Sequence, residues 1–392
     1  MAKGIKIICL FLIITIKAAN SFAQESKDIE HTIESEAFNT ERKLKVFLPE
    51  RYFRDTTQSL IVTYILDAQS EAFWNMAKGN IGYLVRNYQI VPTIVVGIVS
   101  ENRGQEFNPN SQKLKQHLRD EVFQFIEKKY RVEKFRIVVG HSWGGAFVGN
   151  TLFSDDADLF NGYIGISPSL GANDGIILSN ADSILRSNQP IGKFFYCSMG
   201  NIGYREDESF INIMKMDSII KIYPTNENFK WSYELFDNAD HWSCVVPSLN
   251  SGLIRLSRNY FADQKVLEDF ARRKEKNIRL QIEEFNHQQK QKFGFSFTPS
   301  FQYYNFVADD FREQGKYNIA TELYLFSIEK GNNDVVCYFN LAQSYQSIGK
   351  QNLAKSTYLK TLKLLEEQKD KIDVEFFKAL RTETNKRIDN LD

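Results

Sequence analysis

The chain has no excess of charge of either sign, because its 392 residues include 49 Lys or Arg and 49 Asp or Glu. Proteins that bind nucleic acid neutralise phosphates with a surplus of basic residues, so the composition argues against that class of partner. Only four cysteines are present, without a CxxC pair. A disulfide framework and a zinc site are therefore not expected. We favour three buried thiols at Cys197, Cys244 and Cys337, with a single Cys197–Cys244 bridge as the alternative.

The chain also lacks the run of about 20 apolar residues that spans a bilayer. Its first 23 residues instead combine Lys3 and Lys6, the ten-residue apolar run Ile7–Ile16 and the small-residue site Ser21-Phe22-Ala23. This pattern predicts a secretory signal over residues 1–23 and an exported, periplasmic or extracellular bacterial protein. A buried N-terminal strand or helix is the alternative interpretation.

What the chain does contain is ordinary globular material, with 43% hydrophobic and 14% aromatic residues. Across residues 24–262, apolar runs typical of buried strands alternate with segments of helical spacing. This alternation predicts an α/β domain with a mostly parallel sheet covered by helices. The expected strands cover residues 42–48, 60–66, 90–99, 135–139, 162–167, 193–198 and 229–236, with helices over 111–130 and 145–153.

The C-terminal part is predicted to be helical. Residues 263–295 are charged and Gln-rich, which favours a solvated helical linker. Over residues 296–392, five positions recur 34 residues later: Ala308, Gly315, Lys316, Ala320 and Tyr324 return as Ala342, Gly349, Lys350, Ala354 and Tyr358. This period resembles the tetratricopeptide repeat, so we expect a small all-α domain. Its repeats offer a surface for a protein partner or for self-association.

A candidate nucleophile lies in Gly140-His141-Ser142-Trp143-Gly144, which fits the pattern G-x-S-x-G. The pentapeptide follows an expected strand and precedes an expected helix. This is the setting of a nucleophile elbow, in which the serine projects from a tight strand-to-helix turn. A glycine-rich turn with a helix-capping serine is the alternative.

A serine needs a base, and His241 is the best placed of the five histidines. It follows the last expected strand, in the chain order serine then histidine that this fold uses. The acid that orients His241 is expected in the loop after residues 193–198. Three carboxylates lie there, and we rank Asp207 first, with Glu206 and Glu208 as alternatives. A serine–histidine dyad without an acid is the further option.

The oxyanion formed during acyl transfer needs two backbone N–H groups. One is expected from Trp143, the residue after the nucleophile. The other is expected from Ala68 or Gln69, in the turn after residues 60–66.

Five segments together resemble the "putative esterase" (esterase D-like) family of α/β-hydrolases, which includes siderophore-ester hydrolases and family 1 carbohydrate esterases. The segments are YILDAQSEAFW, PTIVVGIVSENRGQEFNP, GHSWGG, GISPSL and DHWSCVVPSLNSGL. The resemblance implies an α/β-hydrolase fold over residues 30–262 and ester hydrolysis by Ser142 and His241. We add Trp74, Arg103, His141 and Trp242 as candidate substrate-binding residues.

Two functions follow from these features. The first is a secreted serine esterase that acts through an acyl-enzyme on a small-molecule or glycan ester, such as a siderophore ester or an acyl-substituted glycan. No metal or organic cofactor is expected for this chemistry. The second is a non-catalytic hydrolase-fold scaffold whose helical repeats bind a protein partner. The presence of Ser142, His241 and both elbow glycines favours the enzyme.

Overall fold

The computed structural model describes residues 26–391 except residues 55, 57, 188–190, 224–227, 274–276 and 295. The expected secretory signal over residues 1–23 lies outside the described residues. The chain divides into two compact units, a larger one of residues 26–260 with 290–294 and a smaller one of residues 261–289 and 296–391. No helix among the described residues is long and apolar enough to cross a membrane.

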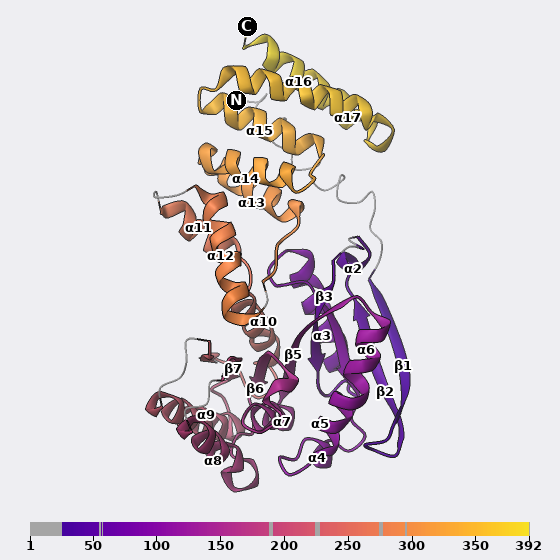
Figure 1. Ribbon diagram of the computed structural model, residues 1–392, viewed down its shortest axis with the longest axis vertical. Coiled ribbons are helices and arrows are strands. Elements are labelled where there is room, and N and C mark those ends of the chain that lie inside the picture. The colour runs from indigo at the N-terminus through magenta and orange to yellow at the C-terminus, as the bar shows by residue number, and fades with distance from the viewer. Residues whose placement is uncertain are drawn as a thin grey trace. The chain divides into compact units, whose positions relative to one another are not determined.

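The larger unit is built on one eight-stranded sheet with the order β1-β2-β4-β3-β5-β6-β7-β8. The first two strands pair antiparallel at one edge, β2 pairs antiparallel with β4, and all remaining neighbours are parallel (Figure 1). The strands are β1 (Lys27–Ser35), β2 (Thr40–Leu48), β3 (Leu60–Ile65), β4 (Thr93–Ile98), β5 (Val132–His141), β6 (Gly162–Ile166), β7 (Phe194–Met199) and β8 (Lys230–Leu235).

The predicted α/β fold is confirmed, and the central strands are the apolar runs recognised in the sequence. Strands β3, β4, β6 and β7 are buried at every position, as expected for parallel strands covered on both faces. Strand β1 was not predicted. Its exposed and half-buried residues alternate, since it lies at the sheet edge and contributes only one face to the core.

Helices cover both faces of this sheet. On one face, Trp74 packs on Gly97 of β4 and Leu256 packs on Gly162 of β6. On the other face, side chains such as Phe123, Phe147 and Ile213 join the strand residues in one buried cluster. The helices of this unit are α2 (Glu50–Arg54), α3 (Glu71–Arg86), α4 (Arg103–Glu106), α5 (Lys113–His117), the π-helix η1 (Leu118–Val122), α6 (Phe123–Lys129), α7 (Trp143–Leu152), the 3₁₀-helix η2 (Ala157–Leu159), α8 (Ala172–Arg186), α9 (Tyr204–Ile222) and α10 (Val245–Ser257).

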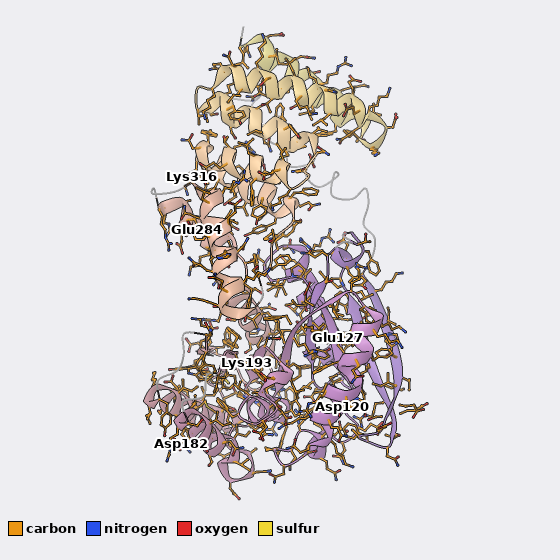
Figure 2. The ribbon with its side chains drawn as sticks, viewed as in Figure 1. Asp120, Glu127, Asp182, Lys193, Glu284 and Lys316 are labelled. Carbon is orange, nitrogen blue, oxygen red and sulfur yellow. The ribbon has the colours of Figure 1, made fainter. Side chains whose placement is uncertain are left out.

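The helix expected over residues 111–130 is present as α5, η1 and α6 in succession. Leu118, Val122 and Ile126 are buried on its inner side. Asp120 and Glu127 lie exposed on its outer side (Figure 2). The π-turn adds one residue to the helical repeat while the apolar stripe stays on the sheet.

The smaller unit is all-helical. It contains α11 (Gln264–Arg272), most of α12 (Ile278–Phe293), α13 (Phe301–Glu313), α14 (Tyr317–Glu329), α15 (Val335–Ser347), α16 (Gln351–Glu367), the 3₁₀-helix η3 (Lys369–Lys371) and α17 (Val374–Asp389). Successive helices from α13 to α17 pack against one another. The segment expected to be a solvated linker forms α11 and α12, in which Leu267, Phe270 and Ile282 are buried.

Candidate active site

Ser142 stands on the tight turn between β5 and α7, with φ 59° and ψ −114°. A non-glycine residue adopts such a backbone only where its surroundings impose it, and active sites are where this strain is commonly found. The Ser142 N–H donates to the Ile166 carbonyl at 2.9 Å. The strand and the helix approach so closely that a Cβ at Gly140 would lie 2.2 Å from the Gly144 oxygen. Glycine at position 140 is therefore required for this turn.

His241 lies in the loop between β8 and α10, and its side chain is buried. Its Nδ1 is 2.7 Å from Oε1 of Glu206. Because a carboxylate only accepts, Nδ1 carries the proton and donates it to Glu206. The other ring nitrogen, Nε2, is then the basic one in the neutral imidazole.

Of the three candidate acids, the structure brings Glu206 to His241 and not Asp207, which had been ranked first. Asp207 and Glu208 are exposed and line a small cavity beside α9. Glu206 is buried and its Oε2 accepts from the Ser167 hydroxyl at 2.9 Å and from the Gly200 N–H. Burial by itself raises the pKa of Glu206, but hydrogen bonds from His241, Gly200 and Ser167 outweigh it and hold the pKa below its ordinary value.

A helical pattern in the sequence could have identified this acid. Glu206 starts the buried face of α9, which continues through Ser209, Ile213, Met216 and Ile220 at spacings of three and four residues. The neighbouring carboxylates at 207 and 208 lie off this face. The N–H groups of residues 201 and 202 both donate to the Ala239 carbonyl, which ties the loop before α9 to the histidine loop.

His141 was predicted to bind substrate, and the structure gives it a positioning contact. Its buried ring donates from Nε2 to the His241 carbonyl at 2.8 Å. The ring centroid lies 4.5 Å from that of His241, and Phe73 stacks at 6.3 Å. Burial and the nearby His241 lower the pKa of His141 to about 4. His141 is therefore a neutral donor that fixes the backbone of the histidine loop.

The two expected halves of the oxyanion hole differ in their availability. Trp143 is the first residue of α7, where backbone N–H groups have no partner within the helix. The Ala68 N–H already donates to the Ile98 carbonyl at 3.1 Å, so Ala68 is excluded as a donor. The Gln69 N–H has no acceptor among the described residues, and it becomes the second candidate.

Arg103 was also predicted to contact substrate, yet its guanidinium is engaged by the protein. Nε donates to Oδ1 of Asp67 at 2.6 Å, and one terminal nitrogen donates both to Oδ2 of Asp67 and to the His141 carbonyl. Asp67 has a φ of 65° and precedes the turn that carries Gln69. The observed contacts tie this turn to the residue before Ser142.

The remaining two predicted substrate-binding residues differ in exposure. Trp74 is 3% exposed and packs on β4, so it belongs to the core, and its neighbour Phe73 lies beside His141 instead. Trp242 is 67% exposed, with its ring centroid 5.2 Å from His141 and 5.6 Å from His241. Of the two tryptophans, only Trp242 has a surface that a ligand can reach.

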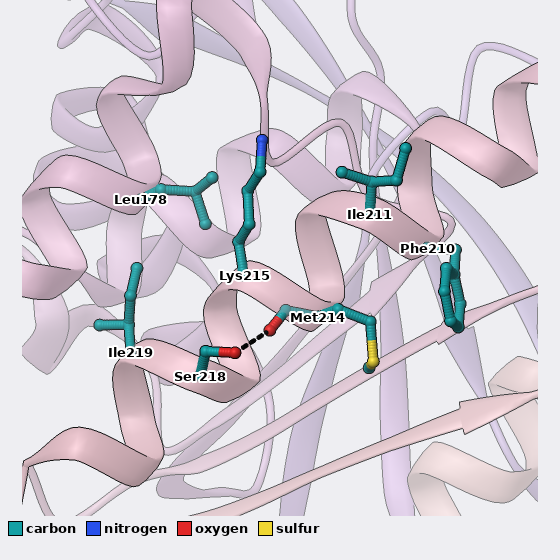
Figure 3. Close-up of a pocket in the computed structure, with 7 residues that line it drawn as sticks. All are labelled: Leu178, Phe210, Ile211, Met214, Lys215, Ser218 and Ile219. Atoms are coloured by element: carbon teal, nitrogen blue, oxygen red, sulfur yellow. Dashed lines mark hydrogen bonds between the residues drawn. The ribbon is translucent and has the colours of Figure 1, made fainter.

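An apolar groove of about 570 Å³ lies between α8 and α9, away from these residues (Figure 3). Its lining includes Leu178, Phe210 and Met214, with Lys215 as the charged member. Ser142, His241 and Glu206 do not line this groove.

In the described part of the chain, no group of three or more His, Cys, Asp or Glu side chains is arranged to hold a metal ion. Cys197, Cys244 and Cys337 are free and buried.

The sheet, the serine turn and the histidine loop are arranged as in the α/β-hydrolase fold. Residues 35–191, within the larger unit, match the model of the family described as "Putative esterase", and this match indicates an ester hydrolase. No curated protein matches the chain.

Solved structures share the fold. An IroE-like serine hydrolase from Shewanella oneidensis has a TM-score of 0.62 at 18% identity and covers 77% of this chain and 99% of its own. An uncharacterised protein from Capnocytophaga ochracea has the same TM-score at 16% identity, covering 93% and 99%. The siderophore hydrolase EstB from Aspergillus nidulans has a TM-score of 0.51 at 16% identity, covering 59% and 95%.

Proposed function

We propose that this protein is a serine carboxylic-ester hydrolase with Ser142 as nucleophile, His241 as general base and Glu206 as the acid of the triad. The observation that carries the proposal is the buried contact between His241 Nδ1 and Glu206, together with a serine on a strained turn whose preceding residue, His141, donates to the His241 carbonyl. It assigns the tautomer of His241 and leaves Nε2 free to take a proton.

The proposed reaction has two halves. Ser142 Oγ attacks the ester carbonyl and transfers its proton to His241 Nε2, while the oxyanion is bound by the N–H groups of Trp143 and Gln69. The protonated His241 then gives its proton to the departing alcohol, which leaves an acyl-enzyme. A water molecule activated by His241 attacks the acyl carbon, and Ser142 recovers its proton as the carboxylic acid leaves.

Glu206 contributes in two ways. It keeps the His241 ring in one orientation through Nδ1, and its negative charge stabilises the imidazolium that forms during each half-reaction. The lowered pKa of Glu206 supports this role, because it keeps the carboxylate ionised at neutral pH.

As substrates we propose siderophore esters or acyl-substituted glycans. The fold likeness to a siderophore hydrolase supports the first class, and exposed Trp242 beside the two histidines offers an apolar surface for either. We further propose that the protein works in the periplasm or outside the cell, which the pattern of residues 1–23 supports. The 34-residue recurrence supports tetratricopeptide-like packing in the helical unit.

Hydrolysis of short-acyl p-nitrophenyl esters tests the proposal. We expect the wild type to be active and Ser142→Ala to lose at least about 10³-fold in kcat, as is typical of a removed nucleophile. Labelling by a fluorophosphonate probe should disappear in the same variant. Wild-type activity that survives in Ser142→Ala would refute the assigned nucleophile. A wild type that neither turns over nor reacts with the probe would favour the non-catalytic scaffold.

A further inference from the structure

The acid of the site is held by more than its contact with His241. Glu206 Oε2 accepts two hydrogen bonds from residues that directly follow two neighbouring strands. The donors are the Gly200 N–H after β7 and the Ser167 hydroxyl after β6. Oε1 is thereby the oxygen left for His241. A carboxylate fixed through both oxygens cannot rotate, so the direction of its hydrogen bond to His241 is also fixed.

The backbone of Ser167 is shaped for this contact. Its φ is 40°, an uncommon value for a residue with a side chain, and its N–H is held by the Ser198 carbonyl at 2.7 Å. The side chain is fully buried. A strained backbone beside a proposed active site, with its side chain aimed at the acid, is more than a strand end requires.

Cys244 completes the arrangement. Its Sγ lies 3.1 Å from Ser167 Oγ. The single hydroxyl proton of Ser167 is given to Glu206, which can only accept, so toward Cys244 the serine oxygen is an acceptor and the thiol is the donor. The thiol also lies 3.7 Å from the His241 carbonyl, and the closer Ser167 oxygen is the acceptor that we assign to its proton. Burial raises the pKa of Cys244 to about 11, which keeps the thiol protonated.

We propose that Ser167 is a positioning residue for catalysis, supported by Cys244 in a thiol-to-hydroxyl-to-carboxylate chain that fixes Glu206 against His241. The proposal rests on the proposed esterase function and adds to it residues that never touch the substrate. It also gives the buried thiol of Cys244 a defined role as a hydrogen-bond donor.

Ser167→Ala tests the proposal, with Ser198→Ala as its matched control. Ser198 is an equally buried serine in register with Ile166, and its hydroxyl has no partner among the described residues. We expect Ser167→Ala to lower kcat about 10-fold with KM unchanged, because a hydrogen bond to a buried charge is lost. Ser198→Ala should stay within about 2-fold of the wild type. Equal kcat values in the two variants, or a loss confined to KM, would overturn the proposal.

A second pair of variants tests the chain without changing Ser167. Cys244→Ser keeps a donor and should retain wild-type kcat, whereas Cys244→Ala should lower kcat about 3-fold, since a thiol is a weak donor. The reverse order would contradict the chain.

A double-mutant cycle shows whether Ser167 acts through the acid. In a Glu206→Gln background, Ser167→Ala should change kcat less than about 2-fold, because its partner is already altered. An undiminished 10-fold loss there would mean that Ser167 acts elsewhere. Failure of the esterase proposal is seen separately, as activity that persists in Ser142→Ala.

Discussion

Among its described residues, the larger unit has two pairs in which a glutamate contacts a buried histidine, and the pairs differ in what surrounds them. His241 and Glu206 are 35 residues apart and meet across the loops that follow β7 and β8. His117 and Glu121 are one helical turn apart, where α5 continues into η1, and His117 Nδ1 also lies 3.0 Å from Ser35 Oγ. Both pairs thus have a serine hydroxyl within their hydrogen-bond network.

The two pairs contain the same residue types and differ in the backbone and the exposure of the serine that lies near each of them. Ser35 ends an edge strand, is 3% exposed and contacts the same ring nitrogen as Glu121. Ser142 is partly exposed on a turn with positive φ, and Glu206 meets the ring through Nδ1. A serine, a histidine and an acid become a candidate site only where a strained turn presents the serine and the second ring nitrogen stays available.

Replacing the glutamate of each pair by glutamine should give the largest difference in kcat between the two pairs. Glu206→Gln should reduce kcat for p-nitrophenyl esters by about 10³- to 10⁴-fold, because the amide can donate to Nδ1 and so favours the wrong tautomer of His241. Glu121→Gln should leave kcat within about 2-fold of the wild type. Asp207→Asn is the neighbouring control and should also remain active. A stronger loss in Asp207→Asn than in Glu206→Gln would reverse the assignment of the acid.

His141 is a further buried histidine and lies beside the His241–Glu206 pair, and its pKa predicts that stability depends on pH. The pKa of His141 is about 4 in the folded chain against 6.5 when unperturbed, so the unfolded chain binds the extra proton between these values. The stabilisation is present above pH 6.5 and is lost as the pH falls toward 4, by about 3 kcal/mol. His141→Gln should flatten this part of the pH profile.

Tryptophan fluorescence isolates the measurement, because all four tryptophans, at 74, 143, 231 and 242, lie in the hydrolase unit. Urea unfolding of the full chain at pH 7 and pH 4.5 then compares wild type and variant. An equal drop in both proteins would assign the pH dependence to other groups, such as His117, whose pKa burial also lowers.

Breaking the contact between His117 and Glu121 should change the stability of the fold and not the catalytic rate. The Ala37 N–H donates to one oxygen of Glu121 at 3.0 Å, and His117 contacts the other. We expect Glu121→Gln to lower the free energy of unfolding by about 1–3 kcal/mol, because a charged hydrogen bond inside the unit is weakened. A variant as stable as the wild type by the fluorescence assay would show that this pair contributes nothing to the fold.

The comparison also explains what the sequence could reveal. Long-range features were predictable where a motif fixes the backbone: the alternation of apolar runs predicted the sheet, and the glycines around Ser142 predicted its turn. Asp207 was ranked above Glu206 because the ranking ignored the helical register that places Glu206 inward and Asp207 outward. This register is local information, so the sequence alone could have favoured Glu206.

Other assignments depended on geometry that no local pattern encodes. Whether the N–H of Ala68 or that of Gln69 is free is decided by a carbonyl on β4, 30 residues away. Trp74 and Phe73 are neighbours on α3, and only the position of that helix on the sheet decides which of them meets β4 and which meets His141. The contacts of Arg103 with Asp67 and with the His141 carbonyl likewise depend on segments that meet at the carboxyl ends of β3, β4 and β5.

Replacing the aromatic residue beside each histidine–glutamate pair should have the smallest effect. The two replacements distinguish a residue that binds substrate, which changes KM, from one that packs in the core, which changes the free energy of unfolding. Trp242 lies exposed over His241, whereas Phe38 meets His117 edge-on at 5.4 Å with the Arg42 guanidinium 4.1 Å from its ring centre. Trp242→Ala should raise KM about 2- to 10-fold for an aryl or long-acyl ester, since an aromatic contact contributes about 0.5–1.5 kcal/mol, and leave the unfolding free energy unchanged. Phe38→Ala should lower the free energy of unfolding and leave KM unchanged. If Trp242→Ala instead destabilises the unit without changing KM, the indole is a packing residue and the two pairs differ less than their exposure indicates.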